Sequence, residues 1–218
     1  MNIKTLLFGS IGTLIETSEL QRESFNEAFK EAGLDWYWDQ EDYRLMLKQS
    51  GGTKRVEDYA EKNNTIVQAS KIRERKTQIF NQKLLTEKIN PRDGVIEVID
   101  YAKDNKIQLG FVTSTTKDNI NSVFLALKDH LKEEDFDFVG NNTMIENVKP
   151  NSEIYLKAIK ILNSNPNSCI AIEDSRESAL SAHNAKISCI AFPGLFHEED
   201  NYDFCSKKML KLDTSIFN

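Results

Sequence analysis

The chain has 218 residues, of which 39% are hydrophobic and 28% are charged, and its net charge is −6. This length and composition are typical of a globular protein with a substantial core and argue against a disordered chain. The acidic charge and the lack of a basic block argue against a nucleic-acid-binding or membrane-surface protein. Three cysteines without CxxC spacing disfavour a disulfide framework or a zinc site and favour reduced thiols in the cytoplasm.

The N-terminal part predicts one strand followed by helices. TLLF, residues 5–8, is an apolar run that predicts a strand. The apolar stretch around it is similar to the middle of a signal peptide, but no small-residue cleavage site follows, so no signal is expected. Ser18 and Gln21 form a capping-box pattern at the start of a helix that ends near Gly33. Further helices are predicted at EDYRLMLKQ, at TKRVEDYAEKN and over residues 66–88.

From Gly94 onward, helical patterns alternate with short apolar runs. The runs IQLGFVT, FDFVG, CIAI and ISCIAF predict strands, and the segments between them have helical spacing. Strands that alternate with helices are typical of a parallel sheet in an α/β fold. We therefore expect a Rossmann-like α/β core domain formed by residues 1–15 and 90–218. Residues 16–89 are expected to form an inserted α-helical cap domain.

Side chains with distinct chemistry stand at the ends of these strands, where open α/β sheets bind their ligands. The hydroxyls of residues 113–116 open a helix and either bind an anion or cap that helix. Lys149 precedes a proline, so its ammonium either points at a fixed site or lies in solvent. Glu173 and Asp174 are placed to ligate a divalent cation. The alternative is that Asp174 or Ser175 caps the next helix. Together these groups predict a pocket for phosphate and magnesium.

These segments, in this order, resemble the haloacid dehalogenase superfamily of phosphatases and mutases, which work through an aspartyl-phosphate. The resemblance covers nearly the whole chain and is strongest to CbbY-like sugar-phosphate phosphatases, a subgroup close to β-phosphoglucomutase. The segments that carry it are ETSELQRESFNEAF, GLDWYWDQEDYRLML, the Gly51-Gly52 turn, VTSTTKDNI, KPNSEIYLKA and IAIEDS. The resemblance implies an α/β core with a helical cap, an Mg²⁺ cofactor and phosphorylated sugars, such as xylulose-1,5-bisphosphate, as ligands.

The first motif of this superfamily reads Asp-x-Asp-Gly-Thr, and this chain departs from it at both acidic positions. The position of the nucleophilic aspartate is Gly9 and that of the general acid/base is Ile11, whereas Gly12 and Thr13 are retained. For the other motifs, the resemblance implies two sets of ligating groups. The phosphate-binding set is Thr113, Ser114 and Lys149, and the magnesium-binding set is Glu173, Asp174 and the backbone carbonyl of Ile11.

The resemblance also implies a set of substrate-binding residues at and beyond the start of the cap. These are Glu16, Gly51, Gly52 and Arg55. Three further positions depart from the usual pattern. They are Gln21 where a histidine is usual, Thr53 where a lysine is usual and Ser178 where a glycine is usual.

The departures at residues 9 and 11 predict loss of catalysis. Aspartyl-phosphate chemistry requires an oxygen nucleophile and a proton shuttle, and Gly9 and Ile11 supply neither. Ser10 is not expected to substitute, because neighbouring side chains of a strand point to opposite faces. Removing two carboxylates weakens magnesium binding and reduces the repulsion of a phosphate dianion. We therefore predict an inactive or severely impaired homologue that still binds a phosphorylated sugar or inorganic phosphate.

Two alternatives remain open. One is an active magnesium-dependent phosphosugar phosphatase with atypical chemistry, in which Asp174 supports attack by metal-bound water. The other is a non-catalytic interaction or scaffold protein. Its expected marks are a closed or apolar-filled pocket and an exposed apolar patch, for which Trp36, Tyr37 and Trp38 are the candidates. Neither alternative implies a nucleic-acid or membrane partner.

Overall fold

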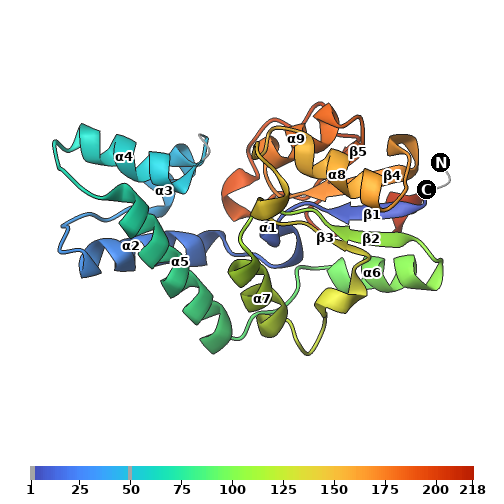
Figure 1. The fold of residues 1–218 in the computed structure, drawn as a ribbon, viewed down its shortest axis with the longest axis horizontal. Coiled ribbons are helices and arrows are strands. Elements are labelled where there is room, and N and C mark those ends of the chain that lie inside the picture. Colours follow the sequence, from blue (N-terminus) through green and yellow to red (C-terminus); the bar gives the residue numbers. More distant parts are fainter. Residues whose placement is uncertain (1–2, 49–50) are drawn as a thin grey trace. The chain divides into compact units, whose positions relative to one another are not determined.

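The computed structural model describes residues 3–48 and 51–218 of a chain that divides into two compact units (Figure 1). The first, here called the core unit, comprises Met1–Glu16 and Ile89–Asn218. The second, the helical unit, comprises Thr17–Lys88. Within the described ranges, no helix combines the length and the apolar character needed to cross a membrane.

The core unit is built on a parallel sheet whose described strands follow the order β3-β2-β1-β4-β5-β6. The strands are β1 (Thr5–Phe8), β2 (Gln108–Phe111), β3 (Phe138–Val139), β4 (Cys169–Glu173), β5 (Ser188–Ala191) and β6 (Lys207–Lys208). All four residues of β1 are buried, as expected for a central strand covered on both faces. Phe8 pairs with Phe111 and Ile172, so Gly9 and Glu173 lie at the same level where the strands end.

Helices cover both faces of this sheet, with α6 and α7 on one face and α8 and α9 on the other (Figure 1). The helices of the core unit are α1 (Ile11–Leu14), α6 (Val95–Asp104), α7 (Lys117–Ala126), α8 (Glu153–Ile161) and α9 (Arg176–Asn184). Because strand side chains alternate, Leu7 joins the apolar cluster under α8 and α9. Phe8 contacts Phe136 on the opposite face, with ring centroids 6.3 Å apart. The fold is therefore the Rossmann-like α/β class that the sequence predicts.

Two helices of the core unit begin with hydroxyl caps beside the strand ends. Thr116 precedes α7 and its side chain accepts a hydrogen bond from the backbone N–H of Asn119, at 3.3 Å. Ser175 precedes α9 and accepts one from the backbone N–H of Ser178, at 3.4 Å. Ser175, and not Asp174, is therefore the cap of α9, which leaves the Asp174 carboxylate without that structural task.

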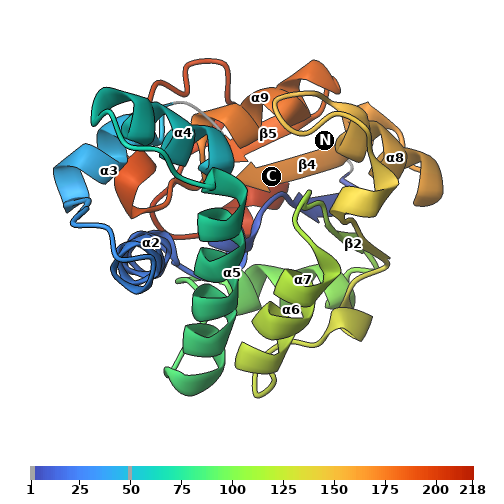
Figure 2. The ribbon, with the colours of Figure 1, turned by 60° about the vertical axis from the view of Figure 1, so that its left-hand side comes forward.

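The helical unit is held together by α2 and α5, which pack against each other (Figure 2). Its helices are α2 (Ser18–Glu31), α3 (Gln40–Met46), α4 (Gly52–Lys62) and α5 (Ala69–Thr86). Thr17, and not the expected Ser18, is the N-cap of α2, and the Thr17 side chain makes no capping hydrogen bond. The Gln21 side chain instead accepts a hydrogen bond from Lys76 on α5.

An aromatic cluster fills the interior of the helical unit. Trp38 is fully buried, with its ring centroid 4.6 Å from that of Phe29 and 4.9 Å from that of Phe25. Trp36 is partly buried against Phe29, and of the three candidate patch residues only Tyr37 is exposed, at 66%. The segment 36–38 therefore does not form the exposed apolar patch expected of a scaffold protein.

Candidate functional site

The space beside Gly9, at the end of β1, is occupied by the side chain of Glu173. A Cβ atom built on Gly9 would overlap the carboxyl carbon and both carboxylate oxygens of Glu173. Glu173 is the last residue of β4 and is fully buried. A side chain at residue 9 and the observed position of the Glu173 carboxylate therefore exclude each other.

Glu173 is the centre of a buried polar cluster that we call the core triad, formed by Lys149, Tyr155 and Glu173. The Lys149 ammonium donates to Glu173 Oε1 at 2.5 Å, and the Tyr155 hydroxyl donates to the same oxygen at 2.7 Å. Lys149 also donates to the backbone carbonyl of Gly9, at 2.6 Å. Lys149 is only 8% exposed, so it is the paired member of a buried cluster and not a solvated lysine.

The electrostatics of the core triad are finely balanced. Burial raises the pKa of Glu173 to about 7, and the charge of Lys149 and the two hydrogen bonds only partly oppose this. Glu173 Oε2 is buried and has no hydrogen-bond partner among the described residues. Such an oxygen is unfavourable unless a ligand or a proton satisfies it. Lys149, for which phosphate binding is a prediction, is therefore already paired with a buried acid.

The loop after β1 keeps its shape although both acids are missing. The Thr13 hydroxyl donates to the carbonyl of Ser10 at 2.7 Å. Ile11 is buried in α1, where its carbonyl accepts a hydrogen bond from the N–H of Ile15 at 3.0 Å. Gly12 gives room to an acidic group, since a Cβ there would overlap the Asp174 carboxylate. The retained Gly12 and Thr13 thus shape the loop, while Ile11 offers only an apolar side chain.

Arg92 also holds this loop, although the sequence alone does not mark it as a functional residue. Its guanidinium donates to the carbonyls of Gly12, Phe192 and Pro193, at 2.7, 2.8 and 2.6 Å. One arginine therefore connects the loop after β1 to the loop after β5. The segment INPRDG around it indicates only a loop, and no local signal in it points to these distant carbonyls.

The residues present do not fit a resident magnesium ion. Magnesium favours octahedral oxygen ligands, usually one or two carboxylates completed by water and phosphate. Glu173 has turned to Lys149 and Tyr155, which leaves Asp174 as the half-buried carboxylate of the expected set. In the described parts of the chain, no three His, Cys, Asp or Glu side chains gather into a cluster that could hold a metal.

The hydroxyl loop after β2 lies at the same edge of the sheet. Thr113 is buried, and its hydroxyl oxygen accepts a hydrogen bond from the N–H of Thr115 at 3.2 Å. Ser114 is half-buried beside it. Asn119, in the first turn of α7, donates to the Thr115 hydroxyl, and its own Oδ1 is buried without a partner among the described residues. The loop is thus ordered by its own polar groups, and its role in phosphate binding stays a prediction.

Glu16 ends the core unit and is tied to another loop of that unit. Its carboxylate accepts a hydrogen bond from the backbone N–H of Leu195, at 2.8 Å. Glu16 is exposed, and its charge favours the protonated form of the nearby Arg92. The predicted contact of Glu16 with a substrate is compatible with this position and remains a prediction.

The helical unit contains a second buried lysine, Lys76, for which the described residues provide no carboxylate. Lys76 is 4% exposed and donates to the Gln21 amide oxygen. Its ammonium lies 5.1 Å from the ring centre of Phe25 and 4.9 Å from that of Phe80. Burial, reinforced by the charges of Arg73 and Arg55, lowers the pKa of Lys76 well below its usual value.

The Gly51-Gly52 turn brings the start of α4 close to the guanidinium of Arg73. Gly51 has a φ of +97°, a conformation that side-chain-bearing residues rarely adopt. A Cβ on Gly52 would lie 2.6 Å from Nε of Arg73, so a side chain there would displace the guanidinium. The two glycines therefore have distinct tasks, a backbone conformation at residue 51 and a close approach at residue 52.

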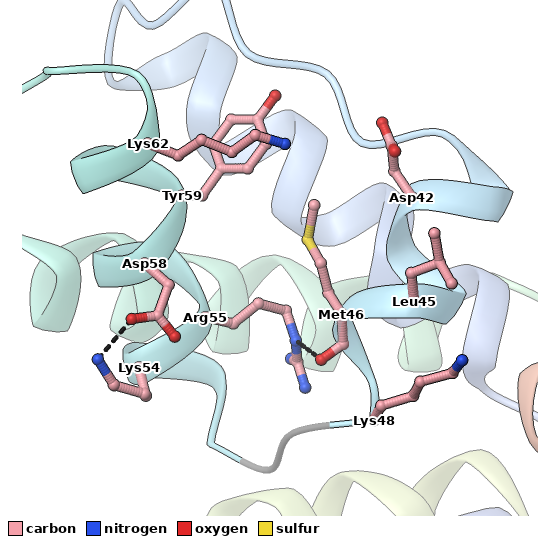
Figure 3. Close-up of a pocket in the computed structure, with 9 residues that line it drawn as sticks. All are labelled: Asp42, Leu45, Met46, Lys48, Lys54, Arg55, Asp58, Tyr59 and Lys62. Atoms are coloured by element: carbon pink, nitrogen blue, oxygen red, sulfur yellow. Dashed lines mark hydrogen bonds and ion pairs between the residues drawn. The ribbon is translucent and has the colours of Figure 1, made fainter.

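Arg55 also lines a pocket of about 420 Å³ between α3 and α4 (Figure 3). Its guanidinium extends toward α3, donates to the Met46 carbonyl at 3.2 Å and lies 5.5 Å from the ring centre of Tyr43. The pocket is lined by four cations, two acids and three less polar residues. These are Lys48, Lys54, Arg55, Lys62, Asp42, Asp58, Leu45, Met46 and Tyr59. Lys54 is paired with Asp58, so the pocket carries an excess of positive charge.

Comparisons with known proteins agree with this architecture. The family model described as haloacid dehalogenase-like hydrolase matches residues 11–192. Protein CbbY of Rhodobacter capsulatus is 33% identical over 205 residues, which is 93% of this chain and 90% of that protein. Protein CbbY of Cereibacter sphaeroides is 34% identical over 202 residues, 90% of this chain and 88% of that protein.

Solved structures give the same result. The crystal structure of CbbY from Rhodobacter sphaeroides in complex with phosphate has a TM-score of 0.85 and 30% identity, covering 96% of this chain and 94% of that one. A mutant of that protein in complex with xylulose-1,5-bisphosphate matches equally well. The family match, the extent of the relatives and the shared fold lead to one conclusion: this chain belongs to the haloacid dehalogenase-like hydrolase family, in its CbbY-like phosphatase subgroup.

Proposed function

We propose that this protein binds a phosphorylated sugar or inorganic phosphate and hydrolyses it at most very slowly. The observation that carries the proposal is the space beside Gly9. A nucleophilic carboxylate at residue 9 is absent, and the volume it would need is occupied by Glu173. Glu173 is held there by Lys149 and Tyr155, so the arrangement is closed by polar groups and not by apolar side chains.

The same geometry argues against the usual covalent chemistry. A covalent phosphoryl intermediate requires an oxygen nucleophile in reach of the phosphorus atom, and Gly9 has no side chain. Protonation of the leaving group requires an acid, and Ile11 has none. Glu173 is not proposed to replace either group, because its carboxylate is fully buried and is held in place through Oε1 by Lys149 and Tyr155. We infer that both chemical steps are lost, and that the affinity for Mg²⁺ is weakened along with them.

Binding is supported by the cations of the helical unit. Lys76 is buried without a carboxylate among the described residues, and the charges of Arg73 and Arg55 act on it. Burial without a carboxylate disfavours the charged form of Lys76, and a phosphate beside it would favour that charged form again. The ligand class is also suggested by the relatives, since the CbbY structures contain phosphate and xylulose-1,5-bisphosphate.

The test combines binding and turnover on the same samples. The unmodified protein is titrated calorimetrically with inorganic phosphate and a panel of sugar phosphates and bisphosphates, with magnesium and with a chelator. Phosphate release from the same ligands is then followed. The expected result is saturable binding of at least one ligand with phosphate release at the background rate.

A double variant tests whether catalysis is lost only because the two acids are missing. Gly9→Asp/Ile11→Asp restores both acids and is expected to gain magnesium-dependent hydrolysis. Its matched control, Gly9→Asn/Ile11→Asp, displaces Glu173 in the same way but lacks the nucleophile. The rate of the restored variant is expected to exceed that of the control by about 10²-fold or more.

Three outcomes would contradict the proposal. Turnover by the unmodified protein that survives Ser10→Ala and disappears in Asp174→Ala would establish the atypical metal-water phosphatase. No binding of any ligand, in the presence or absence of magnesium, would leave a scaffold role. Equal rates for the restored variant and its asparagine control would show that residue 9 is not the missing nucleophile.

A further inference from the structure

Two of the three cysteines meet at the edge of the sheet. Cys189 lies in β5, and Cys205 lies in the turn that leads into β6. The segments are joined directly next to the cysteines, since Ser206 donates its backbone N–H to the carbonyl of Cys189 at 2.8 Å. The Ser206 hydroxyl donates to the same carbonyl at 2.9 Å. The backbone therefore holds residues 189 and 205 close to each other.

Both side chains face the same apolar cluster, under α8 and α9. Cys189 is a buried member of that cluster and is 2% exposed, whereas Cys205 is partly buried and packs against it. The Cys189 thiol donates to the backbone carbonyl of Ile190 at 3.7 Å, and its electrostatic interaction with Cys205 shifts the pKa values of both thiols. Cys205 directly precedes Ser206, the residue bonded to Cys189, and both cysteines pack on one cluster, so the two side chains share one environment.

The two thiols are chemically unequal. The interaction between the two thiols lowers the pKa of Cys205 and raises the pKa of Cys189, which is also buried. Cys205 is also the more exposed of the two. Reactivity with oxidants follows thiolate character and exposure, so Cys205 is the thiol that reacts first.

The third cysteine provides an internal comparison. Cys169 begins β4, is 1% exposed and donates its thiol to the Asn165 carbonyl at 3.2 Å. Burial raises the pKa of Cys169. It therefore combines low exposure with low thiolate character and has a carbonyl in place of a thiol partner.

We propose that Cys189 and Cys205 form an intramolecular disulfide when the protein meets a peroxide, and that thiols reverse it. The Cys205 thiolate attacks the O–O bond of the peroxide, giving a sulfenic acid and releasing hydroxide, which is protonated to water. The Cys189 thiol then loses its proton and attacks the Cys205 sulfur, and the hydroxyl leaves as water. Two electrons pass from the two sulfurs to the peroxide, which is reduced to two molecules of water.

This bond would close the loop from residue 189 to residue 205 and fix the turn that precedes β6. β6 is a short, exposed strand at the edge of the sheet, and pairs with β5 over residues 207 and 208. Cys189 lies in the same buried cluster as Tyr155, whose hydroxyl donates to Glu173. The proposed disulfide would therefore connect a weakly held edge to the scaffold of the core triad.

The test uses the full-length, reduced protein and hydrogen peroxide. After brief exposure, the intact mass is expected to fall by two hydrogens, and the number of cysteines alkylated after denaturation is expected to fall from three to one. Peptide mapping is expected to find Cys189 joined to Cys205, and dithiothreitol to restore all three thiols. In the matched control Cys169→Ser, the two remaining cysteines are expected to form the same disulfide, so that neither is alkylated after oxidation.

The variant Cys205→Ser is expected to fold normally, because residue 205 is partly exposed, and it therefore provides a clean test. It is expected to show no mass loss and to retain two alkylatable cysteines under the same peroxide. Oxidation of Cys205 to sulfinic acid while Cys189 remains alkylatable would overturn the proposal. So would covalent dimers joined through Cys205. None of these outcomes depends on whether the protein binds or hydrolyses a phosphorylated sugar.

Discussion

Each unit of this protein buries one lysine, and the two lysines have opposite surroundings. Lys149, in the core unit, meets the Glu173 carboxylate at 2.5 Å and the Gly9 carbonyl at 2.6 Å. Lys76, in the helical unit, has an amide oxygen and two aromatic rings, and no carboxylate among the described residues. The first lysine is paired with an acid inside the fold, whereas burial of the second disfavours its charged form.

The proposed function links this difference to the absence of acidic side chains at residues 9 and 11. At residue 9 the side chain is missing, and the neighbouring acid Glu173 occupies the free volume. Lys149 is thereby paired inside the protein and is less available to a phosphate. The loss of two carboxylates therefore does not simply make the pocket more positive, as charge counting along the sequence predicts. Anion binding then depends more on the cations of the helical unit.

The largest expected effect comes from removing the two lysines separately. Lys149→Met leaves the buried Glu173 unpaired and is expected to lower the free energy of unfolding by about 3–5 kcal/mol at alkaline pH. Lys76→Met removes a buried cation that lacks a carboxylate, and is expected to be neutral or stabilising. Urea unfolding in phosphate-free buffer measures both.

A rescue variant serves as the control for that comparison. Lys149→Met/Glu173→Leu replaces both charged partners by apolar groups and is expected to recover most of the lost stability. Equal destabilisation by Lys149→Met and Lys76→Met would break the comparison, because it would mean that the two lysines are equally well compensated.

The pH dependence of stability gives the next effect. The pKa of Glu173 is about 7 in the folded protein, above the value of about 4.3 expected for an unfolded chain. The folded state then binds this proton more tightly, so the contribution to stability is complete below about pH 4 and disappears as the pH rises through 7. Relative to Glu173→Gln, the unmodified protein is expected to lose up to about 4 kcal/mol between these limits.

Chelator in the buffer keeps metal ions out of that measurement, and urea unfolding at several pH values supplies both curves. Parallel curves for the unmodified protein and Glu173→Gln would show that Glu173 keeps an ordinary pKa. The Lys149–Glu173 ion pair would then behave like a solvent-exposed pair, in which burial does not shift the pKa of the acid.

The smallest expected effect concerns affinity for inorganic phosphate. Lys76→Met and Arg73→Met are each expected to weaken binding by about 10-fold, equivalent to about 1.4 kcal/mol. Each substitution removes a basic side chain that the proposed function assigns to anion binding. The matched control is Lys54→Met, an exposed lysine already paired with Asp58, for which little change is expected. Calorimetric titration separates them, and a loss of affinity confined to Lys54→Met would place the anion elsewhere.

Much of the fold could be predicted because its signals are local. TLLF and CIAI are short apolar runs bounded by polar residues, and they are strands of a parallel sheet, as predicted. The two-residue strand β6 could not be predicted, since Lys207 and Lys208 have no apolar pattern and pair only because β5 presents an edge. The capping box predicted at Ser18 is wrong because Gln21 bonds to Lys76, far along the chain, and not to its own helix.

The candidate site could be predicted as a set of positions but not as a set of contacts. Residues 9, 149 and 173 do converge, because parallel strands end at one edge of the sheet. The pairing of Glu173 with Lys149 depends on the volume left by a missing Cβ, and nothing in the neighbouring sequence indicates it. Tyr155 lies in the segment KPNSEIYLKA, where the family resemblance gives it no role, and Lys76 lies in a helix whose pattern marks it only as one charge among many.

The central claim is that this protein binds a phosphorylated sugar without hydrolysing it. The most direct measurement is a calorimetric titration of the unmodified protein with xylulose-1,5-bisphosphate, in magnesium-containing buffer, with phosphate release followed in the same cell. The predicted result is a saturable heat of binding, and no phosphate released above that from a protein-free control. Sustained phosphate release in proportion to the protein concentration would contradict the account.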